Sequence, residues 1–454
     1  MLKLRQLGWV CVGLCLAFGP VAVRAADTNS LVWHRTTDRV DADVRDMALR
    51  PLLEKIASDA SWRIYVEPGV THVVSAKFKN LPSVEALRML FGDLNFALVP
   101  QTNAVPRLYV FRTVRQNATQ LVRAPAPPAK HVPNELLVKL KPGADIDALA
   151  KLLGAKITGR NDKLGLYRLL FDNASATDAA LAGLKNNSDV AAVDYNYYYD
   201  PPPTPQLLSS APVGPLSLTL NPPGDSGKVI VGLPDTAEQS LGAQLDKFIL
   251  PQLSVVGDAN APGTDLTHGT AMAYSILESI AQQSGGGTSV QILPVDIYDS
   301  GESTTSWNVA LGIQKAVDNG ATILNLSLGG VGDSPVLDNI IQQAIASGIP
   351  VIVAAGNTPG VTTYPAATQG VIPVTALGQP GQLASYANFW PDPEMIALPG
   401  ASVVYFNGQP WGVQGTSVAT AYATGMAAEN RVMTGASWAQ IIAAMQQKFA
   451  VPAK

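Results

Sequence analysis

The C-terminal half of this 454-residue sequence, residues 225–454, predicts an α/β domain with a largely parallel sheet and helices on both faces, and two small α+β domains precede it. Short apolar runs such as KVIVGLP and VIVAA end in polar residues and alternate with helical patterns, as in parallel sheets that are covered on both faces. Two proline-rich segments, 124–130 and 200–206, favour extended backbone and cannot lie inside helices, so they indicate linkers. Hydrophobic residues make up 47% of the chain, which is enough for packed cores.

Residues 1–25 have the pattern of a signal peptide. A basic start, MLKLR, precedes an apolar stretch from Leu7 to Phe18, and small residues precede an expected cleavage at Ala26. The stretch is too short and too interrupted for a dependable membrane span, so we expect an exported chain with no stable membrane span. Both cysteines, Cys11 and Cys15, lie in this segment, and the mature chain would therefore use no disulfide or thiol chemistry.

Residues 27–115 form the first predicted domain. Two helices, the second with Ser83 as its N-cap, are interleaved with strands at 62–67 and 73–79 and are followed by further strand-like runs. The apolar helical faces consist of Leu49, Leu52, Leu53 and Ile56, and of Leu87, Leu90, Phe91 and Leu94. The run SAKFKNLPSVEALRMLFGDLNFALV resembles the short N-terminal domain of secretins and TonB-dependent receptors. That resemblance implies a periplasmic interaction module of a Gram-negative-type bacterium, with an envelope protein as partner and no chemistry of its own.

A linker at 116–130 leads to the second predicted domain, residues 131–199, and a further linker at 200–224 follows it. The second domain has strand patterns at 135–141, 156–158, 164–171 and 190–199 and helical patterns at 144–154 and 176–186. This βαββαβ order predicts a split βαβ sandwich, which is a ferredoxin-like arrangement.

Within the α/β domain, the run GTSVATAYATG at 415–425 places Ser417 where a loop turns into a small-residue helix. A serine at the positive end of a helix dipole lies where developing negative charge is stabilised. The alternative is a buried helix that Ser417 merely caps, because serine is a preferred N-cap. A nucleophilic serine also needs a base, and histidine suits that task near neutral pH.

His268 is the one histidine in the C-terminal half, and it opens a helix in the run THGTAMAYSILESIA. An isolated histidine at a helix start is more often structural, so a third group should orient it. Asp235 ends the apolar strand that starts at 228, at the edge where open α/β sheets place their chemistry, although Pro234 and Asp235 also suit a simple turn. Asn357, after the strand at 351, offers a side-chain amide that could donate to an oxyanion.

These four segments, together with NLSLGG at 325–330, YPAATQGVIPVTAL at 364–377 and ALPG at 397–400, resemble the subtilisin-like serine protease family (subtilases, peptidase family S8) over about half of the chain. The resemblance implies a serine endopeptidase with Ser417 as nucleophile, His268 as general base, Asp235 as orienting carboxylate and Asn357 as oxyanion donor. It implies that the substrate is held by Ser327, Leu328, Gly329, Ala354, Ala355 and Gly356. No cofactor is required for this chemistry, and structural Ca²⁺, which many subtilases bind, has no compact oxygen-ligand loop to support it in the sequence.

Two positions depart from the family pattern. Ala237 stands where the family usually has glycine, and alanine would be strained if that backbone needs positive φ. Ala421 replaces a usual proline and should be benign inside a helix. A displaced Asp235 would leave a catalytically inactive subtilase-like envelope binding module. A sedolisin-type acid peptidase is a second alternative, although it uses a Glu/Asp pair where this chain has a histidine in HGT.

The 131–199 block is similar to the propeptide domain of subtilases, which implies an intramolecular inhibitor whose last strand lies in the active-site cleft. We therefore expect a zymogen that cuts itself in the 200–224 linker, within 206–214. From residue 225 onward the chain has 16 acidic and 6 basic residues, a formal charge of −10, which disfavours nucleic acid as a partner. Polypeptides are the expected substrates, and export to the periplasm or the extracellular space is the expected location.

Overall fold

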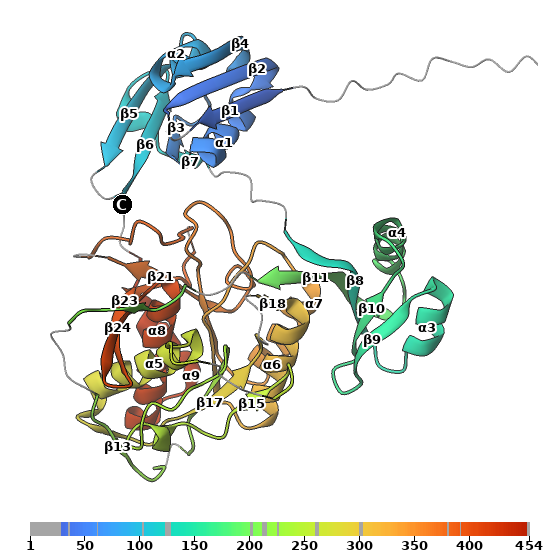
Figure 1. The fold of residues 1–454 in the computed structure, drawn as a ribbon, viewed down its shortest axis with the longest axis vertical. Helices are drawn as coiled ribbons and strands as arrows, with labels where there is room; N and C mark the ends of the chain where they lie inside the picture. Colours follow the sequence, from blue (N-terminus) through green and yellow to red (C-terminus); the bar gives the residue numbers. More distant parts are fainter. Residues whose placement is uncertain are drawn as a thin grey trace, which may run out of the picture.

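The computed structural model describes residues 29–451 with the exception of 35–36, 61, 102–103, 123–128, 200–202, 211–215, 225–226, 259–262, 299–302, 379–380 and 391. The predicted signal peptide, most of the proline-rich segment 124–130 and part of the segment 200–206 lie outside the described residues. Three folded units follow one another along the chain (Figure 1). No helix in the described part of the chain is both long enough and apolar enough to cross a bilayer.

The N-terminal unit has one core between two sheets, with strand orders β1-β2-β4 and β5-β6-β3-β7. The predicted apolar faces of both helices are buried in this core. Its elements are β1 (Ser30–His34), β2 (Arg39–Ala48), α1 (Leu49–Ala60), β3 (Arg63–Val66), β4 (Val73–Pro82), α2 (Ser83–Phe91), β5 (Asn95–Gln101), β6 (Ala104–Phe111) and β7 (Gln120–Val122).

Two predictions for this unit are wrong. The unit does not end at 115, because β7 pairs antiparallel with β3 and completes the second sheet, so the predicted linker 116–130 starts too early. Ser83 is not the N-cap of α2, because Pro82 holds that position and the side chain of Ser83 makes no cap bond. The Ser83 hydroxyl donates instead to Asp38 Oδ1 at 2.6 Å, which ties the helix to the β1–β2 connection.

The second unit has the predicted βαββαβ order. Its strands pair in the order β11-β8-β10-β9, with α3 and α4 packed on one face of the sheet. Both helices start at side-chain caps, because Asp145 and Asn173 accept bonds from backbone N–H groups of the first turns. The elements are β8 (His131–Leu140), α3 (Ile146–Leu153), β9 (Lys156–Asn161), β10 (Leu166–Leu170), α4 (Ala174–Leu184) and β11 (Val190–Tyr199).

The C-terminal unit is built on a sheet with strand order β15-β17-β14-β19-β20-β21-β22, and these strands pair in parallel. Its bounds are β14 (Ile230–Asp235), β15 (Leu253–Ser254), β17 (Gln291–Asp296), β19 (Ile323–Leu326), β20 (Val351–Ala354), β21 (Ile372–Leu377) and β22 (Ile396–Pro399). Successive residues of one strand enter different cores: Ile323 packs with α5 (His268–Ser284) and α8 (Thr416–Thr434), and Leu324 packs with α6 (Ser306–Asp318) and α7 (Pro335–Ala346). Helices therefore cover both faces, and the predicted fold class is confirmed.

Short elements complete the C-terminal unit and join it to the segment that precedes it. A small sheet of β23 (Ala401–Phe406) and β24 (Gln409–Gln414) leads directly into α8, and β12 (Gln206–Leu207) pairs with β24. The remaining elements are β13 (Thr219–Leu220), β16 (Gly287–Thr288), β18 (Thr304–Thr305) and α9 (Trp438–Lys448). The last residues of β11 pair antiparallel with β18, so one strand of the second unit extends into the C-terminal unit (Figure 1).

Candidate active site

Ser417 lies in the first turn of α8 and is only 5% exposed. The N-cap of this helix is Gly415, whose φ of 148° is a conformation that glycine adopts far more readily than other residues. Ser417 is therefore not a capping residue, and the structural alternative for it is wrong. Its backbone N–H belongs to the first turn, where N–H groups lack intrahelical partners and can bind an anion.

His268 and Asp235 form a buried pair. His268 begins α5 after its N-cap Thr267, and its Nδ1 lies 2.8 Å from Asp235 Oδ1 and 3.0 Å from Oδ2. A carboxylate can only accept, so Nδ1 carries the proton and Nε2 is left as the basic nitrogen. Asp235 Oδ1 also accepts a bond from Thr236 N at 2.7 Å, which fixes the carboxylate.

Gly269 allows the first turn of α5 to lie against the loop that follows Asp235. A Cβ atom added at Gly269 would lie inside 3.0 Å of Thr236 O, a separation that real Cβ atoms essentially never have. Instead, Gly269 N donates to Thr236 Oγ1 at 2.8 Å. The glycine in the HGT motif therefore sets the distance between the helix that carries His268 and the strand that carries Asp235.

Ala237 is not strained. It is absent from the described non-glycine residues with positive φ, and its carbonyl accepts a bond from Thr267 Oγ1 at 2.8 Å. The Asp235 loop is thereby tied to the cap of α5, and the geometric basis for an inactive protein is removed. Ala421 is fully buried within α8, so the loss of the usual proline is accommodated as expected.

Glu238 is a second carboxyl group near Asp235. Its two oxygens are inaccessible to solvent and have no hydrogen-bond partner among the described residues. Burial, reinforced by the charges of Asp235 and Asp246, raises the pKa of Glu238 well above its ordinary value. Burial therefore favours the neutral form of Glu238, and Asp235 is the carboxyl group that bonds the imidazole.

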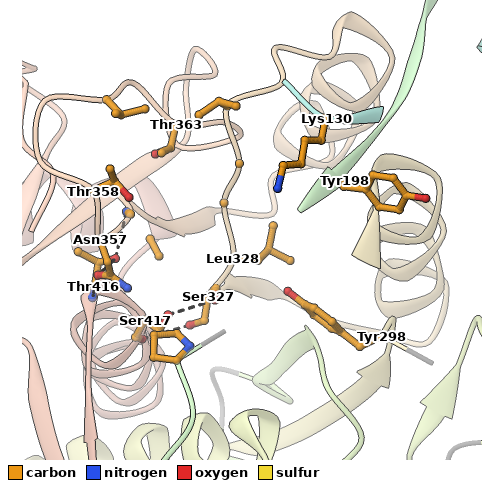
Figure 2. Close-up of a pocket in the computed structure, with 17 residues that line it drawn as sticks. Lys130, Tyr198, Tyr298, Ser327, Leu328, Asn357, Thr358, Thr363, Thr416 and Ser417 are labelled. Carbon is orange, nitrogen blue, oxygen red and sulfur yellow. Dashed lines mark hydrogen bonds between the residues drawn. The ribbon is translucent and has the colours of Figure 1, made fainter. Parts of the chain in front are cut away.

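Asn357 is oriented by the residue that precedes the serine. Its Oδ1 accepts bonds from Thr416 N at 2.9 Å and Thr416 Oγ1 at 3.1 Å, and this leaves Nδ2 as the donor atom of the amide. The carbonyl of Ser327 accepts a bond from Ser417 Oγ at 3.2 Å, and Ser327 Oγ donates to Ser417 O at 3.1 Å. Figure 2 shows Asn357, Ser417 and Ser327 on the border of one cavity.

This cavity has a volume of about 440 Å³. Five of the six predicted substrate-binding residues line it, and Ala355 is the exception because its side chain points into the core on the other side of the strand end. Sequence reasoning missed Thr363, Thr416 and Tyr298 in its wall. Thr416 could have been found, because it precedes Ser417 in the GTS run, whereas Thr363 and Tyr298 lie outside the site motifs. The lining residues that come from before the C-terminal unit are Lys130, Tyr198 and Pro203.

The structure does not bring Ser417 and His268 into a hydrogen bond within the described residues. The serine hydroxyl is directed to the Ser327 carbonyl, while Pro203 of the preceding segment lies in the same cavity. Serine reaches another rotamer by rotation of one side-chain torsion, and catalytic bonds often tighten only when substrate is bound. The predicted residues are thus assembled as two pairs, His268 with Asp235 and Ser417 with Asn357, on the carboxyl ends of strands and the N-termini of helices.

A parallel α/β sheet that combines a helix-terminal serine, an Asp–His pair and an adjacent amide defines a subtilisin-like serine hydrolase. A model of the subtilase family, Peptidase_S8, matches residues 228–449, and a model of the fervidolysin N-terminal prodomain matches residues 117–196. A subtilisin of Bacillus pumilus is 33% identical over 195 residues, which are 39% of this chain and 70% of that protein. The chain belongs to the subtilase family.

Other relatives are matched over less of their length. A thermostable alkaline protease of Halalkalibacterium halodurans is 34% identical over 190 residues, so the chain spans about half of that relative, with 39% of this chain and 52% of the other covered. The crystal structure of fervidolysin from Fervidobacterium pennivorans, "a keratinolytic enzyme related to subtilisin", has a TM-score of 0.55 at 19% identity over 70% of this chain and 57% of that chain. This likeness is one of fold and extends over more of the chain than the C-terminal unit alone.

Proposed function

We propose that the chain is a serine endopeptidase that hydrolyses peptide bonds through an acyl-enzyme. The observation that carries this proposal is the buried pair of His268 and Asp235, with Nδ1 at 2.8 Å from the carboxylate, in a chain of the subtilase family. A sedolisin-type peptidase is not favoured, because a histidine occupies the position of the base. An inactive envelope module is not favoured either, because Ala237 has no strained backbone.

In the proposed reaction, His268 Nε2 accepts the Ser417 proton as Oγ attacks the peptide carbonyl, and the proton then passes to the leaving amine. Asp235 holds the imidazole in the required tautomer and stabilises the imidazolium. The Ser417 N–H and Asn357 Nδ2 donate to the oxyanion, and one such donor contributes roughly 3 to 4 kcal/mol. Water then repeats the attack on the acyl-enzyme with His268 again as the base.

The expected substrate is an extended segment in the interior of a polypeptide. The chain's own segment supports this, because Tyr198 and Tyr199 pair with β18 before Pro203 and Gln206 and Leu207 pair with β24 after it. Between these pairs, Pro203 lies in the cavity with Ser417. Strand addition on both sides of a nucleophile is how an endopeptidase holds a chain that continues in both directions.

Labelling with a fluorophosphonate probe tests the proposal. The processed protein should be labelled at Ser417 and should hydrolyse unfolded protein near neutral to alkaline pH. The matched control is the Ser417→Ala variant, which lacks the hydroxyl that the probe labels. Asp235→Asn should lower turnover less than Ser417→Ala but still severely, because the tautomer of His268 is lost. A folded, processed wild type that neither labels nor hydrolyses would support an inactive binding module.

Self-processing is the proposed route to the active form. Pro203 in the cavity supports an inhibitory role for the segment, since peptide bonds next to proline resist many proteases, and we place the cut within 206–214. Intact mass of wild type and of Ser417→Ala decides between routes. Processing that persists in Ser417→Ala would mean that another protease cuts, and an active wild type of full length would mean that residues 131–199 are a permanent neighbour.

We also propose that the residues of the N-terminal unit, from β1 through β7, form an envelope interaction module like the short N-terminal domains of secretins and TonB-dependent receptors. Their separate core supports an independent role, and the pattern of residues 1–25 supports export to the periplasm or beyond. Edman sequencing of the exported protein should start near Ala26, and a cytoplasmic, uncleaved product would contradict export.

No cofactor is proposed, so EDTA should leave turnover intact; a loss of thermal stability in EDTA that Ca²⁺ restores would instead show structural calcium.

A further inference from the structure

Strand β11 joins the second unit, called here the prodomain, to the catalytic unit through polar contacts. Asn196 Oδ1 accepts bonds from Trp307 N at 3.1 Å and Ser306 Oγ at 3.3 Å, so the prodomain caps the first turn of α6. Tyr197 N donates to Ser306 Oγ at 2.9 Å. The Tyr197 ring also covers Gly332, where an added Cβ would lie inside 3.0 Å of the ring.

Asp194 lies on the face of β11 that is turned toward the catalytic unit. Val193 belongs to the prodomain's own core, whereas Asp194 is paired with Leu137 of β8, and Leu137 packs in the core that contains α6 and α7. Paired residues on antiparallel strands share one face of the sheet. The burial of Asp194, which is 6% exposed, is therefore contributed by docking on the catalytic unit.

The two oxygens of this carboxyl group differ in their contacts. Oδ1 accepts bonds from Tyr195 N at 2.7 Å and Tyr197 OH at 3.0 Å. Oδ2 is buried and has no hydrogen-bond partner among the described residues. An ionised carboxylate with one unpaired buried oxygen is unfavourable, whereas the protonated acid places a neutral hydroxyl there.

The charges around Asp194 also favour its neutral form. Asp333, which precedes α7 in the catalytic unit, repels a charge at Asp194 more strongly than Lys185, the C-cap residue of α4, attracts it. Together with burial, which is the largest cause, this raises the pKa of Asp194 to about 7. The other titratable or charged groups on the elements packed around β11 are His131, Glu135 and Lys139 of β8, Asp178 of α4, Tyr195, Tyr197, Tyr198 and Tyr199 of β11, Lys315 and Asp318 of α6, and Asp338 of α7.

We propose that Asp194 makes the attachment of the prodomain to the catalytic unit dependent on pH: the protonated acid holds β11 on the α6–α7 side, and its ionisation next to Asp333 loosens the strand. Loosening starts at Tyr197, whose hydroxyl bonds Asp194 and whose ring covers Gly332. The next two residues, Tyr198 and Tyr199, form the strand end that pairs with β18 beside the active-site cavity. Protonation of one prodomain carboxyl group thereby controls access to the cleft.

The direction of the effect follows from proton binding. The docked form has a pKa of about 7 for Asp194, and in the released form, where this face meets water, the pKa returns toward the ordinary aspartate value of 3.8. Between these values the docked form holds more protons, so raising the pH weakens docking by up to about tenfold per pH unit. Docking is strongest in acid, and no further weakening from this group occurs above the docked pKa.

Amide hydrogen exchange on the full-length Ser417→Ala chain tests this inference without using protease activity. Protection of residues 195–199, corrected for the intrinsic pH dependence of exchange, should fall at least tenfold between pH 5 and pH 7 and then level off. With Asp194→Asn added, protection should stay high at every pH, because the amide is neutral and of the same shape. Asp178→Asn is the matched control: its carboxylate bonds Tyr195 OH from the exposed side, and the pH dependence should persist.

The inference is wrong if protection in the parent chain does not change with pH, or if the Asp194→Asn chain loses protection as the parent does. Should Asp194→Asn fail to fold by circular dichroism, Asp333→Asn replaces it. Removing that charge lowers the pKa of Asp194, so the loss of protection should end at a lower pH than in the parent. An unchanged profile in a folded Asp333→Asn chain overturns the role of the facing carboxylate.

Discussion

Replacement of Gly269 by alanine should separate the catalytic pair while leaving its residues in place. The new Cβ would lie inside 3.0 Å of the backbone oxygen of Thr236, and backbone on both sides leaves no flexible side chain to give way. The first turn of α5 and the loop after Asp235 must then part by roughly 1 Å, and a misplacement of that size costs on the order of 100-fold in rate. Overpacking of the buried contact should also cost about 1 to 3 kcal/mol of stability.

Two measurements distinguish misplacement from general damage. The first is kcat/KM of the processed, folded enzyme on a peptide substrate, which should fall about 100-fold for Gly269→Ala. The second is the low-field proton signal of His268 Nδ1, which depends on the bond of 2.8 Å to Asp235 and should shift or vanish.

Gly312→Ala is the matched control. Gly312 lies on α6, a helix that carries none of the proposed catalytic residues, and its added Cβ would lie 2.5 Å from Ile297 Cγ2. This variant should lose stability to a similar extent, yet its folded fraction should keep kcat/KM within a few-fold. Wild-type kcat/KM and an unshifted His268 signal in folded Gly269→Ala would refute the claim that this glycine sets the spacing of the pair.

Three further outcomes are expected. Ser417→Ala and His268→Ala should each remove nearly all turnover, and the double variant should lose little more, because the groups act as a unit; additive losses would contradict this. Asn357→Ala should lower kcat about 10²- to 10³-fold with little change in KM, which is the effect known for the corresponding oxyanion donor of subtilisin, and steady-state kinetics would reveal it. Gly332→Ala should press on the Tyr197 ring and release the prodomain more readily, so that full-length protein is processed faster while the processed enzyme keeps its kcat.

Local patterns were sufficient to predict the elements that carry the site. The βαββαβ order of 131–199 follows from periodicity within each short segment, and its last strand was predicted with its observed bounds, Val190–Tyr199. Asp235, His268 and Ser417 each mark the end of a strand or the start of a helix, and these ends meet at one edge of a parallel sheet. For this reason, the residues of the site could be named before their distances were known.

What the sequence did not reveal depends on partners far away in the chain. Strand β7 exists because it pairs with β3, and β12 and β18 are two-residue strands that form only against β24 and β11. Such short segments have no periodicity of their own. Ala355 was assigned to the substrate because it belongs to the run AAGN, but residues alternate in direction along an extended chain, and its side chain enters the core.

Strand β11, whose end lies beside the active-site cavity, is bound to the catalytic unit less tightly than its burial suggests. Tyr199 is fully buried between the units, but its hydroxyl has no partner within the described part of the chain, and the same holds for Asp194 Oδ2. Each buried polar atom left unpaired costs about 1 to 3 kcal/mol. Because both groups regain water when β11 leaves, these terms favour release. An apolar strand of the same shape would stay bound more tightly, so the polar residues of β11 suit a segment that must first fill the cleft and later vacate it.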